Sequence, residues 1–204
     1  MTPSAFRTMT GADAEATDRL AAYLMLLEKW QRQINLVGPG SMRDPWRRHI
    51  LDSAQLAPLL PAGLPTVVDL GTGAGFPGVV LAIMGQTRVH LVESNARKCT
   101  FLSEVLRITE VDATIHHQRI ELLGSVAADV ATARGCANLL TLLDYARPLL
   151  APSGICLFLK GQSFEAELTE SQKKWKMRTQ RIASRSDPAG VVLKLSDIVP
   201  RHDH

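Results

Sequence analysis

The hydrophobic pattern of the chain changes near residue 62, from helical spacing to short, continuous apolar runs. Five apolar residues in the first part recur at the spacing of a helix: Leu20, Tyr23, Leu24, Leu27 and Trp30. This spacing predicts a helix over residues 12–34. A break at Gly38-Pro39-Gly40 follows, and prolines at positions 45 and 58 bound a second expected helix over residues 45–57. Residues 1–61 are therefore predicted to form a small helical cap.

Beyond the cap, short apolar runs alternate with helical stretches. The expected strands cover residues 66–70, 89–92, 113–116, 129–133 and 155–159. The expected helices cover residues 77–84, 96–107, 137–150 and 164–175. This alternation predicts an α/β fold with a mostly parallel sheet covered by helices on both faces. Two further extended runs, residues 176–184 and 190–195, are expected to form an antiparallel C-terminal hairpin at the sheet edge.

Length and composition exclude several classes of protein. The 204 residues, 46% of them hydrophobic and 21% charged, fit one domain over residues 1–204, with the cap at 1–61 and an α/β core at 62–204. No apolar run approaches the ~18 residues that span a bilayer, and residues 1–11 lack the apolar core of a signal peptide. The three cysteines, Cys99, Cys136 and Cys156, form no CxxC pair, which argues against a zinc site or a disulfide framework. We expect a cytoplasmic protein without a metal and without membrane association.

A glycine-rich segment after the first expected strand is the sharpest local signal. It reads Val68-Asp69-Leu70-Gly71-Thr72-Gly73-Ala74-Gly75-Phe76-Pro77-Gly78. Its glycines let the backbone turn sharply and approach a ligand closely, at the end of the strand where open α/β sheets bind ligands. Glu93, at the end of the next strand and 22 residues after Gly71, can accept hydrogen bonds from both hydroxyls of a ribose. The segment therefore predicts a nucleotide site.

Two nucleotide ligands compete for this segment. Gly73 to Gly78 matches the GxGxxG pattern of dinucleotide-binding proteins, but that pattern alone is weak evidence. Asp69 before the first glycine is the arrangement found in S-adenosylmethionine (AdoMet) methyltransferases. The ammonium and sulfonium groups of AdoMet favour a nearby carboxylate, whereas a pyrophosphate is repelled by one. The loop favours AdoMet, and an NAD-dependent oxidoreductase and a ligand-free turn remain as alternatives.

Motifs outside the loop point to one family. They are Trp30, Asn35-Leu36-Val37, Arg48-His49-Ile50-Leu51-Asp52-Ser53, Arg97-Lys98, Arg134 and Leu159-Lys160-Gly161. With the glycine loop among them, in this order, residues 23–161 resemble the RsmG (GidB) family. The resemblance implies a class I, Rossmann-like methyltransferase fold with a seven-stranded sheet, AdoMet as methyl donor and S-adenosylhomocysteine as product. It also implies methylation of N7 of guanine 527 in 16S ribosomal RNA (rRNA), with 16S rRNA or the small ribosomal subunit as partner.

The same resemblance implies which positions bind the cofactor. Carried over position by position, these are Gly71, Phe76, Ile120, Glu121 and Arg134. The loop argument adds Asp69, Gly73 and Gly75, and the ribose argument adds Glu93. Two features depart from the family pattern: Thr132-Ala133 and Gly135 flank Arg134, where something closer to Ser-Arg-Ala is expected, and residues 184–195 match only weakly.

The expected chemistry needs no general base. Guanine N7 carries a lone pair and no proton, so catalysis consists mostly of holding the nucleophile and the methyl group in line. The candidates for placing the guanine are Asn35, His49, Asp52, Arg134 and Lys160. Three of them have a plainer interpretation beside this one. His49 is equally a packing residue, Asp52 a hydrogen-bonding partner inside the cap, and Lys160 a solvated surface lysine.

The net charge of +3 permits a polyanionic partner, and two basic clusters stand out along the chain. The first comprises Arg43, Arg47 and Arg48, and the second comprises Lys173, Lys174, Lys176, Arg178, Arg181 and Arg185. Either cluster can meet RNA phosphates, or form a merely solvated face. We expect a monomer that acts on rRNA. A methyltransferase of another RNA, a protein or a small molecule, and a non-catalytic AdoMet-binding or RNA-binding module, remain open.

Overall fold

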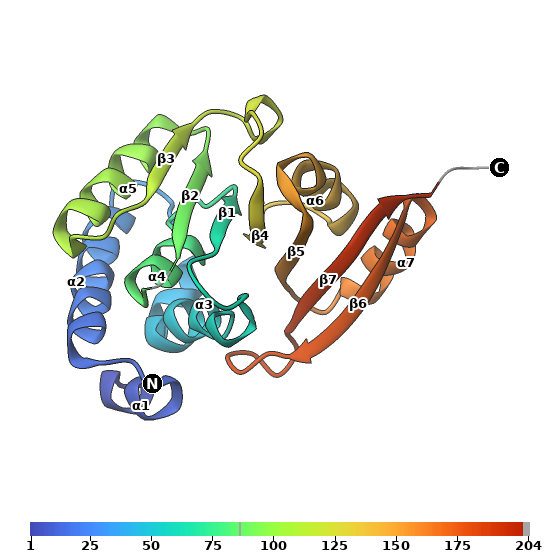
Figure 1. Ribbon diagram of the computed structural model, residues 1–204. Coiled ribbons are helices and arrows are strands. Elements are labelled where there is room, and N and C mark those ends of the chain that lie inside the picture. The colour runs from blue at the N-terminus through green and yellow to red at the C-terminus, as the bar shows by residue number, and fades with distance from the viewer. Residues whose placement is uncertain (86, 202–204) are drawn as a thin grey trace.

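A seven-stranded sheet runs through the centre of the computed structural model, which describes residues 1–85 and 87–201 (Figure 1). The strand order is β3-β2-β1-β4-β5-β7-β6. The strands are β1 (Thr66–Leu70), β2 (Arg88–Glu93), β3 (Thr114–His117), β4 (Ala128–Arg134), β5 (Leu150–Lys160), β6 (Trp175–Ala183) and β7 (Val191–Pro200). The first five pair in parallel, whereas β7 pairs antiparallel with both β5 and β6. The predicted fold class, a mostly parallel sheet with an antiparallel C-terminal hairpin, is confirmed.

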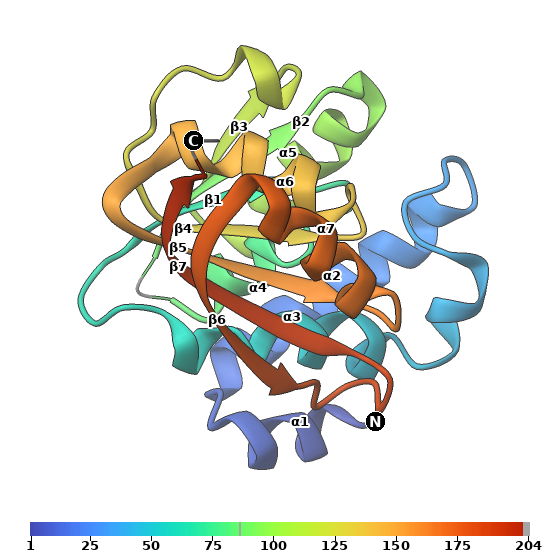
Figure 2. The ribbon, with the colours of Figure 1, turned by 90° about the vertical axis from the view of Figure 1, so that its right-hand side faces the viewer.

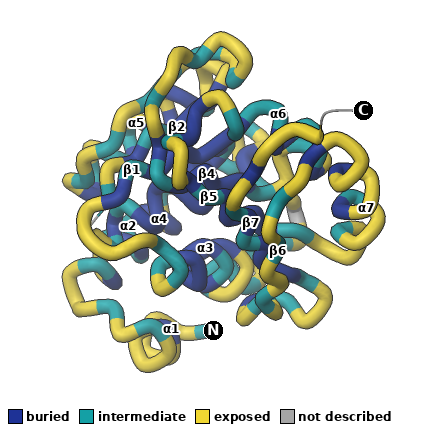
Figure 3. Tube along the Cα trace, turned by 45° about the vertical axis from the view of Figure 1, so that its right-hand side comes forward, coloured by how far each residue is buried: buried dark blue, intermediate teal, exposed yellow. Residues whose placement is uncertain are grey.

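Helices cover both faces of the sheet (Figure 1, Figure 2). One face carries α4 (Gly78–Ile83), α5 (Ala96–Thr109) and the N-terminal helices α1 (Pro3–Thr10), α2 (Ala14–Gln31) and α3 (Asp52–Ala54). The other face carries α6 (Leu139–Ala146) and α7 (Phe164–Lys174). Side chains alternate along β1 accordingly, with Val67 packed on the α4 side and Val68 on the α6 side. Figure 3 shows the buried positions concentrated in the central strands and α4, and exposed ones on α1 and α7.

Short helical turns complete the connections between these elements. They are Pro39–Arg43, Trp46–Leu51, Ala57–Leu59, Ile120–Leu122 and Arg147–Leu149. The turn Trp46–Leu51 has the wide spacing of a π-helix and continues directly into α3. In the described part of the chain, no helix combines the length and the apolar character needed to cross a membrane.

Several element boundaries differ from the sequence prediction; the second predicted helix, 45–57, is divided into the turn Trp46–Leu51 and α3, and β7 continues to Pro200 instead of ending at 195. The helix predicted over 12–34 ends at Gln31, because the Gln31 side chain bonds the backbone of Leu36 and Val37 and turns the chain. The helix predicted over 137–150 begins only after Asn138, whose side chain accepts a hydrogen bond from the Thr141 N–H. Strand β5 starts at Leu150 rather than at 155. Helix α1 was not predicted, because Phe6 is its one buried residue and a single apolar position sets no period.

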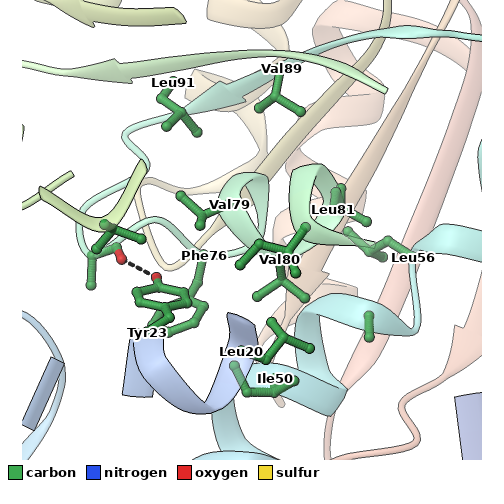
Figure 4. Packing of buried hydrophobic residues seen from close by; sticks show 14 of the residues in the cluster. Leu20, Tyr23, Ile50, Leu56, Phe76, Val79, Val80, Leu81, Val89 and Leu91 are labelled. Carbon is green, nitrogen blue, oxygen red and sulfur yellow. Dashed lines mark hydrogen bonds between the residues drawn. The ribbon is translucent and has the colours of Figure 1, made fainter. Parts of the chain in front are cut away.

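The N-terminal helices pack on α4 and hold the glycine-rich loop. Figure 4 shows Val80 of α4 facing Leu20 and Ile50, while Val79 lies toward Leu91 of the sheet. The fully buried Tyr23 of α2 donates a hydrogen bond to the Ala74 carbonyl in the loop (Figure 4). The cap and the loop therefore form one packed unit, so the cap fixes where the loop lies.

Candidate functional site

Two cavities lie side by side at the carboxyl ends of the parallel strands. The strand order reverses between β1 and β4, and ligands of open α/β sheets bind at such a reversal. The first cavity, called the cleft, has a volume of about 340 Å³ and is lined from the ends of β1, β2 and β4. The second, called the Arg134 cavity, has a volume of about 480 Å³. Gly135 lines both, so the two cavities lie on either side of the residue that follows β4.

Gly71 brings the loop after β1 against the loop after β4. Its φ of +61° lies in the left-handed region, and a Cβ at this position would overlap the Cys136 sulfur. Gly75 is equally constrained on the cap side, because a Cβ there would lie 2.7 Å from the Tyr23 hydroxyl. Only glycine allows this loop to lie between the cleft and the cap.

Glu93 presents a buried carboxylate to the cleft. Its side chain is held on both oxygens, since Oε2 accepts from the Gly73 N–H at 3.1 Å and Oε1 from the Asn95 N–H at 2.8 Å. The Lys98 ammonium lies 3.9 Å from Oε2. Each carboxylate oxygen can accept further hydrogen bonds, so the group is fixed in place and still able to bind a diol.

The outer wall of the cleft comes from the segment after β3. Ile120 and Glu121 line it from the turn Ile120–Leu122, beside Tyr145 of α6. The Tyr145 hydroxyl donates to Glu121 Oε1 at 2.8 Å. A backbone hydrogen bond, and then this bond from Tyr145, hold the pKa of the Glu121 carboxyl below its usual range. Four of the predicted cofactor positions, Gly71, Glu93, Ile120 and Glu121, thus surround one cavity.

Asp69 is buried and does not contribute to the lining of the cleft. Its carboxylate is fully buried and accepts hydrogen bonds from the Thr72 hydroxyl at 2.5 Å, the Gly78 N–H at 3.0 Å and the Thr132 hydroxyl at 2.9 Å. Burial raises the pKa of Asp69 to about 6, even though these bonds act in the opposite direction. Asp69 therefore organises the loop.

Phe76 is also buried, between the cap and the second cavity. Its ring stacks on Tyr23, with centroids 5.1 Å apart, and on His49, with centroids 4.8 Å apart. The Arg134 guanidinium carbon lies 4.6 Å from the centre of the same ring. Phe76 thus links the glycine loop to the residues of the Arg134 cavity.

Four of the five residues predicted to place the guanine line the Arg134 cavity: His49, Asp52, Arg134 and Lys160. Arg134 Nη1 donates to the Arg48 carbonyl at 3.0 Å and lies 3.3 Å from Asp52 Oδ2. Asp52 Oδ1 accepts from the Ser186 hydroxyl at 2.5 Å, so the pair is tied to the β6–β7 turn. The fifth residue, Asn35, is exposed and outside the lining of both cavities. Arg134, predicted for the cofactor as well, lines the Arg134 cavity and not the cleft.

Lys160, in the lining of the Arg134 cavity, has a structural role. Its ammonium lies 2.6 Å from Glu167 Oε2 and donates to the Ala137 carbonyl at 2.8 Å. The same Glu167 oxygen accepts from the Leu139 N–H at the start of α6. Lys160 therefore fixes the loop after β4, which carries Gly135 and Cys136.

Sequence reasoning missed the part played by the β6–β7 turn. Ser184, Asp187 and Gly190 line the Arg134 cavity. Asp187 also forms an ion pair with Arg48 of the cap, with 2.8 Å between Oδ2 and Nη1. One signal for this was available. A hairpin whose second strand runs antiparallel to β5 must have its turn at the carboxyl ends of the parallel strands. Ser41, which lines the same cavity, has no comparable signal in the sequence. No group of metal-ligating side chains gathers among residues 1–85 and 87–201.

The strand order and the cleft at its reversal define a class I, Rossmann-like AdoMet-dependent methyltransferase fold. Solved structures of that class have the same fold. A SAM-dependent methyltransferase from Aquifex aeolicus matches with a TM-score of 0.59 and 13% identity, covering 79% of this chain and 98% of that one. TYW2 from M. jannaschii, solved in complex with AdoMet, matches with a TM-score of 0.58 and 14% identity, covering 84% of this chain and 80% of that one.

Sequence comparison resolves the family within that class. The family described as rRNA small subunit methyltransferase G (GidB) matches residues 16–187. Ribosomal RNA small subunit methyltransferase G of Paramagnetospirillum magneticum is 52% identical over 198 residues, covering 97% of both chains. The Rhodospirillum rubrum protein of the same name is 52% identical over 198 residues, covering 97% of this chain and 98% of that one. The chain belongs to the RsmG (GidB) family of small-subunit rRNA methyltransferases.

The buried Asp69 predicts a measurable pH dependence of stability. Its pKa of about 6 in the folded protein exceeds the value of about 3.9 in an unfolded chain, so the folded state binds the proton more tightly. Asp69 therefore contributes stability that is fully present below about pH 4 and is lost as pH rises through about 6. We expect Asp69→Asn to flatten the free energy of unfolding across this window, by up to about 3 kcal/mol.

Urea unfolding of both proteins at a series of pH values measures this difference. Asp18→Asn, which removes an exposed carboxylate from α2, is the matched control and should leave the profile unchanged. Parallel profiles for the wild type and Asp69→Asn would show that the buried carboxylate holds its proton no more tightly than in the unfolded chain.

Proposed function

We propose that this protein transfers a methyl group from AdoMet to N7 of a guanine in 16S rRNA, at position 527 of that RNA. The observation that carries the proposal is that the cleft and the Arg134 cavity lie on either side of Gly135, in a chain of the small-subunit rRNA methyltransferase family. A donor in one cavity and a base in the other would approach each other at Gly135.

The cleft suits AdoMet in size and in chemistry. Its volume of about 340 Å³ lies within the range of small-molecule sites, about 300–1,000 Å³. We assign the ribose hydroxyls to Glu93, and the adenine end to Ile120 and Glu121. We assign the loop backbone at Gly71, Gly73 and Gly75 to close approach to the cofactor. Asp69 holds the loop through the Gly78 N–H, and Phe76 anchors it to the cap. AdoMet would supply a methyl group on a sulfonium, which makes the leaving thioether, S-adenosylhomocysteine, neutral.

The Arg134 cavity would position the guanine and move no proton. Burial, with the positive charges of Arg134 and Arg48, lowers the pKa of His49 to about 3, so this histidine is a very weak base. The carboxylate of Asp52 and the ammonium of Lys160 are each held in an ion pair. Guanine N7 has no proton to remove, so a site without a free base suits this acceptor. Positioning of the two reactants would then provide most of the rate enhancement.

The first basic cluster, Arg43, Arg47 and Arg48, lies on the side from which RNA would reach the Arg134 cavity. These three residues are exposed, and Arg48 lines the cavity itself. Much of the second cluster lies toward the opposite end of the sheet, where Trp175 pairs with Pro200. We therefore assign the phosphate contacts near the site to the first cluster.

We treat residues 1–204 as one methyltransferase domain that acts as a monomer on the rRNA of the small subunit. One hydrophobic cluster joins cap and core, since Phe6, Leu20 and Leu27 belong to the same cluster as Val67 and Leu91. The cap also supplies His49 and Asp52 to the Arg134 cavity. Cap and α/β core are therefore both needed for the site.

A methyl-transfer assay tests the proposed reaction. Labelled AdoMet is incubated with small ribosomal subunits, or with naked 16S rRNA, from cells that lack this protein. We expect label at one guanine of 16S rRNA, with N7-methylguanosine as the labelled nucleoside after digestion. Label on another base, or on another atom of guanine, would contradict the proposed acceptor. Tight AdoMet binding without transfer to any RNA would contradict the proposed substrate class.

Glu93→Ala should weaken AdoMet binding about tenfold or more, because a bound diol would lose a charged hydrogen-bond acceptor. Isothermal titration calorimetry measures the affinity, and thermal unfolding without ligand checks that the fold is intact. Glu104→Ala removes an exposed carboxylate from the neighbouring α5 and serves as the control. Equal affinities for Glu93→Ala and the control would place the ribose elsewhere.

Removal of two arginines from the first basic cluster should weaken RNA binding in a salt-dependent way. For Arg43→Ala with Arg47→Ala, we expect the slope of log affinity against log salt to fall by about 1 for each lost phosphate contact. Lys176→Ala with Arg178→Ala removes the same charge from β6 as a matched control. A smaller slope of log affinity against log salt for the β6 variant, with an unchanged slope for the cluster variant, would contradict the assignment of the phosphate contacts to the first cluster.

A further inference from the structure

His49 occupies an unusual position for a polar side chain. It is 4% exposed, its ring is stacked on Phe76 with an interplanar angle of 17°, and it contributes to the lining of the Arg134 cavity. One ring nitrogen, Nε2, lies 2.9 Å from the Ser41 hydroxyl. The ring is therefore fixed by stacking on one side and by a hydrogen bond at one edge.

The hydrogen bonds of Ser41 determine which nitrogen of His49 carries the proton. The Ser41 hydroxyl donates its single proton to the Gly38 carbonyl at 2.6 Å, so it has none to offer His49. His49 Nε2 must then be the donor in the contact with Ser41. A neutral ring carries one proton, and with that proton on Nε2, Nδ1 is left as an acceptor with a free lone pair.

Nδ1 of His49 has no hydrogen-bond partner within residues 1–85 and 87–201, although it is buried. A buried acceptor without a donor is rare, and such exceptions often mark a functional site. Burial, and then the positive charges of Arg134 and Arg48, lower the pKa of His49 and keep the ring neutral. The free protein thus holds an unused acceptor on a residue that lines the cavity assigned to the target base. The atom itself is covered in the free protein, so a base reaches it only when the ring turns or the cavity wall shifts.

We propose that His49 Nδ1 accepts a hydrogen bond from the Watson–Crick edge of the target guanine and makes His49 a specificity residue of this enzyme. The proposal rests on the function proposed above. Guanine carries N–H donors at N1 and at its 2-amino group, whereas adenine has a bare nitrogen at N1. A fixed acceptor favours the first and repels the second, and enzymes that act on a base read this edge by hydrogen bonds.

The neighbouring polar groups are already engaged and leave this role to His49. Asp52 accepts from Ser186 and pairs with Arg134, and Lys160 pairs with Glu167. The methylated guanine carries a positive charge. A neutral His49 suits this product, because a protonated histidine would repel it. Binding of the base through N1 or its 2-amino group leaves N7 free for the methyl group.

The tautomer is measured first, and independently of activity. Long-range ¹H–¹⁵N spectra of the full chain, labelled on histidine, distinguish the protonated ring nitrogen from the bare one, and the His49→Asn variant assigns the signals. We expect the Nε2–H form, unchanged from about pH 5 to pH 8, where an ordinary histidine titrates. A proton on Nδ1, or a charged ring in this range, overturns the proposal.

Two substitutions then separate the roles of the two nitrogens. The amide of Asn lies close to the position of Nδ1, and the amide of Gln reaches the position of Nε2. We expect His49→Asn to keep methyl transfer to 16S rRNA within about threefold of wild type. We expect His49→Gln, which preserves the contact with Ser41 but not the acceptor, to lose about tenfold or more in kcat/KM. Both should bind AdoMet like wild type.

The pattern of outcomes is decisive. An active Gln variant beside an inactive Asn variant shows that the contact with Ser41 matters, and overturns the proposal. Equal loss in both variants, with AdoMet binding intact, assigns the ring to packing on Phe76, and wild-type activity in both shows that neither nitrogen is needed. Either result also overturns the proposal. Absence of methyl transfer to guanine by the wild-type protein is a separate result, and contradicts the proposed function rather than the role of His49.

Discussion

The site depends on one buried carboxylate. Asp69 accepts hydrogen bonds from Thr72 in the glycine loop, from Gly78 at the start of α4 and from Thr132 on β4. These three elements surround the point where the strand order reverses. A buried carboxylate is costly unless its oxygens are occupied by donors, so the three segments must all be in place together. The geometry of the cleft thus depends on the correct folding of the glycine loop, the start of α4 and β4 around Asp69.

Packing of the cap on the glycine loop connects the positions of the residues around the Arg134 cavity to those around the cleft. Phe76 belongs to the glycine loop, yet its ring is covered by Tyr23 and His49 of the cap and by Arg134 of β4. A shift of the loop would therefore move the residues that face the Arg134 cavity as well. Cofactor and substrate sites are connected here by packing, because dense interiors transmit small displacements instead of absorbing them. For a reaction that depends on alignment, this coupling suits the proposed chemistry.

The sequence predicted the sheet well and the connections less well. Strand β1 matches its predicted range of 66–70, because a short run of buried apolar residues ending in glycine has few other interpretations. Strand β5 begins earlier than predicted, because residues 151–154 contain proline and glycine and do not resemble a strand. Helix α1 has one buried residue, and the β6–β7 turn contributes to the Arg134 cavity through contacts between distant parts of the chain. Local patterns carry no information on either feature.

The same distinction applies to the candidate site. The motifs that suggested His49, Asp52, Arg134 and Lys160 led to four residues around one cavity, although they are up to 111 positions apart in the chain. Their states could not be read from the sequence. The ammonium of Lys160 fixes the loop after β4, and the tautomer of His49 is determined by a serine that no motif includes. Residue type defines what a side chain can do, but its hydrogen-bond partners define which nitrogen or oxygen remains available. In the proposed reaction, this site uses no general base, so its side chains act by holding the guanine in line with the methyl group. The atoms that can do so are the ones that have no hydrogen-bond partner within the protein, and these decide how the substrate is held.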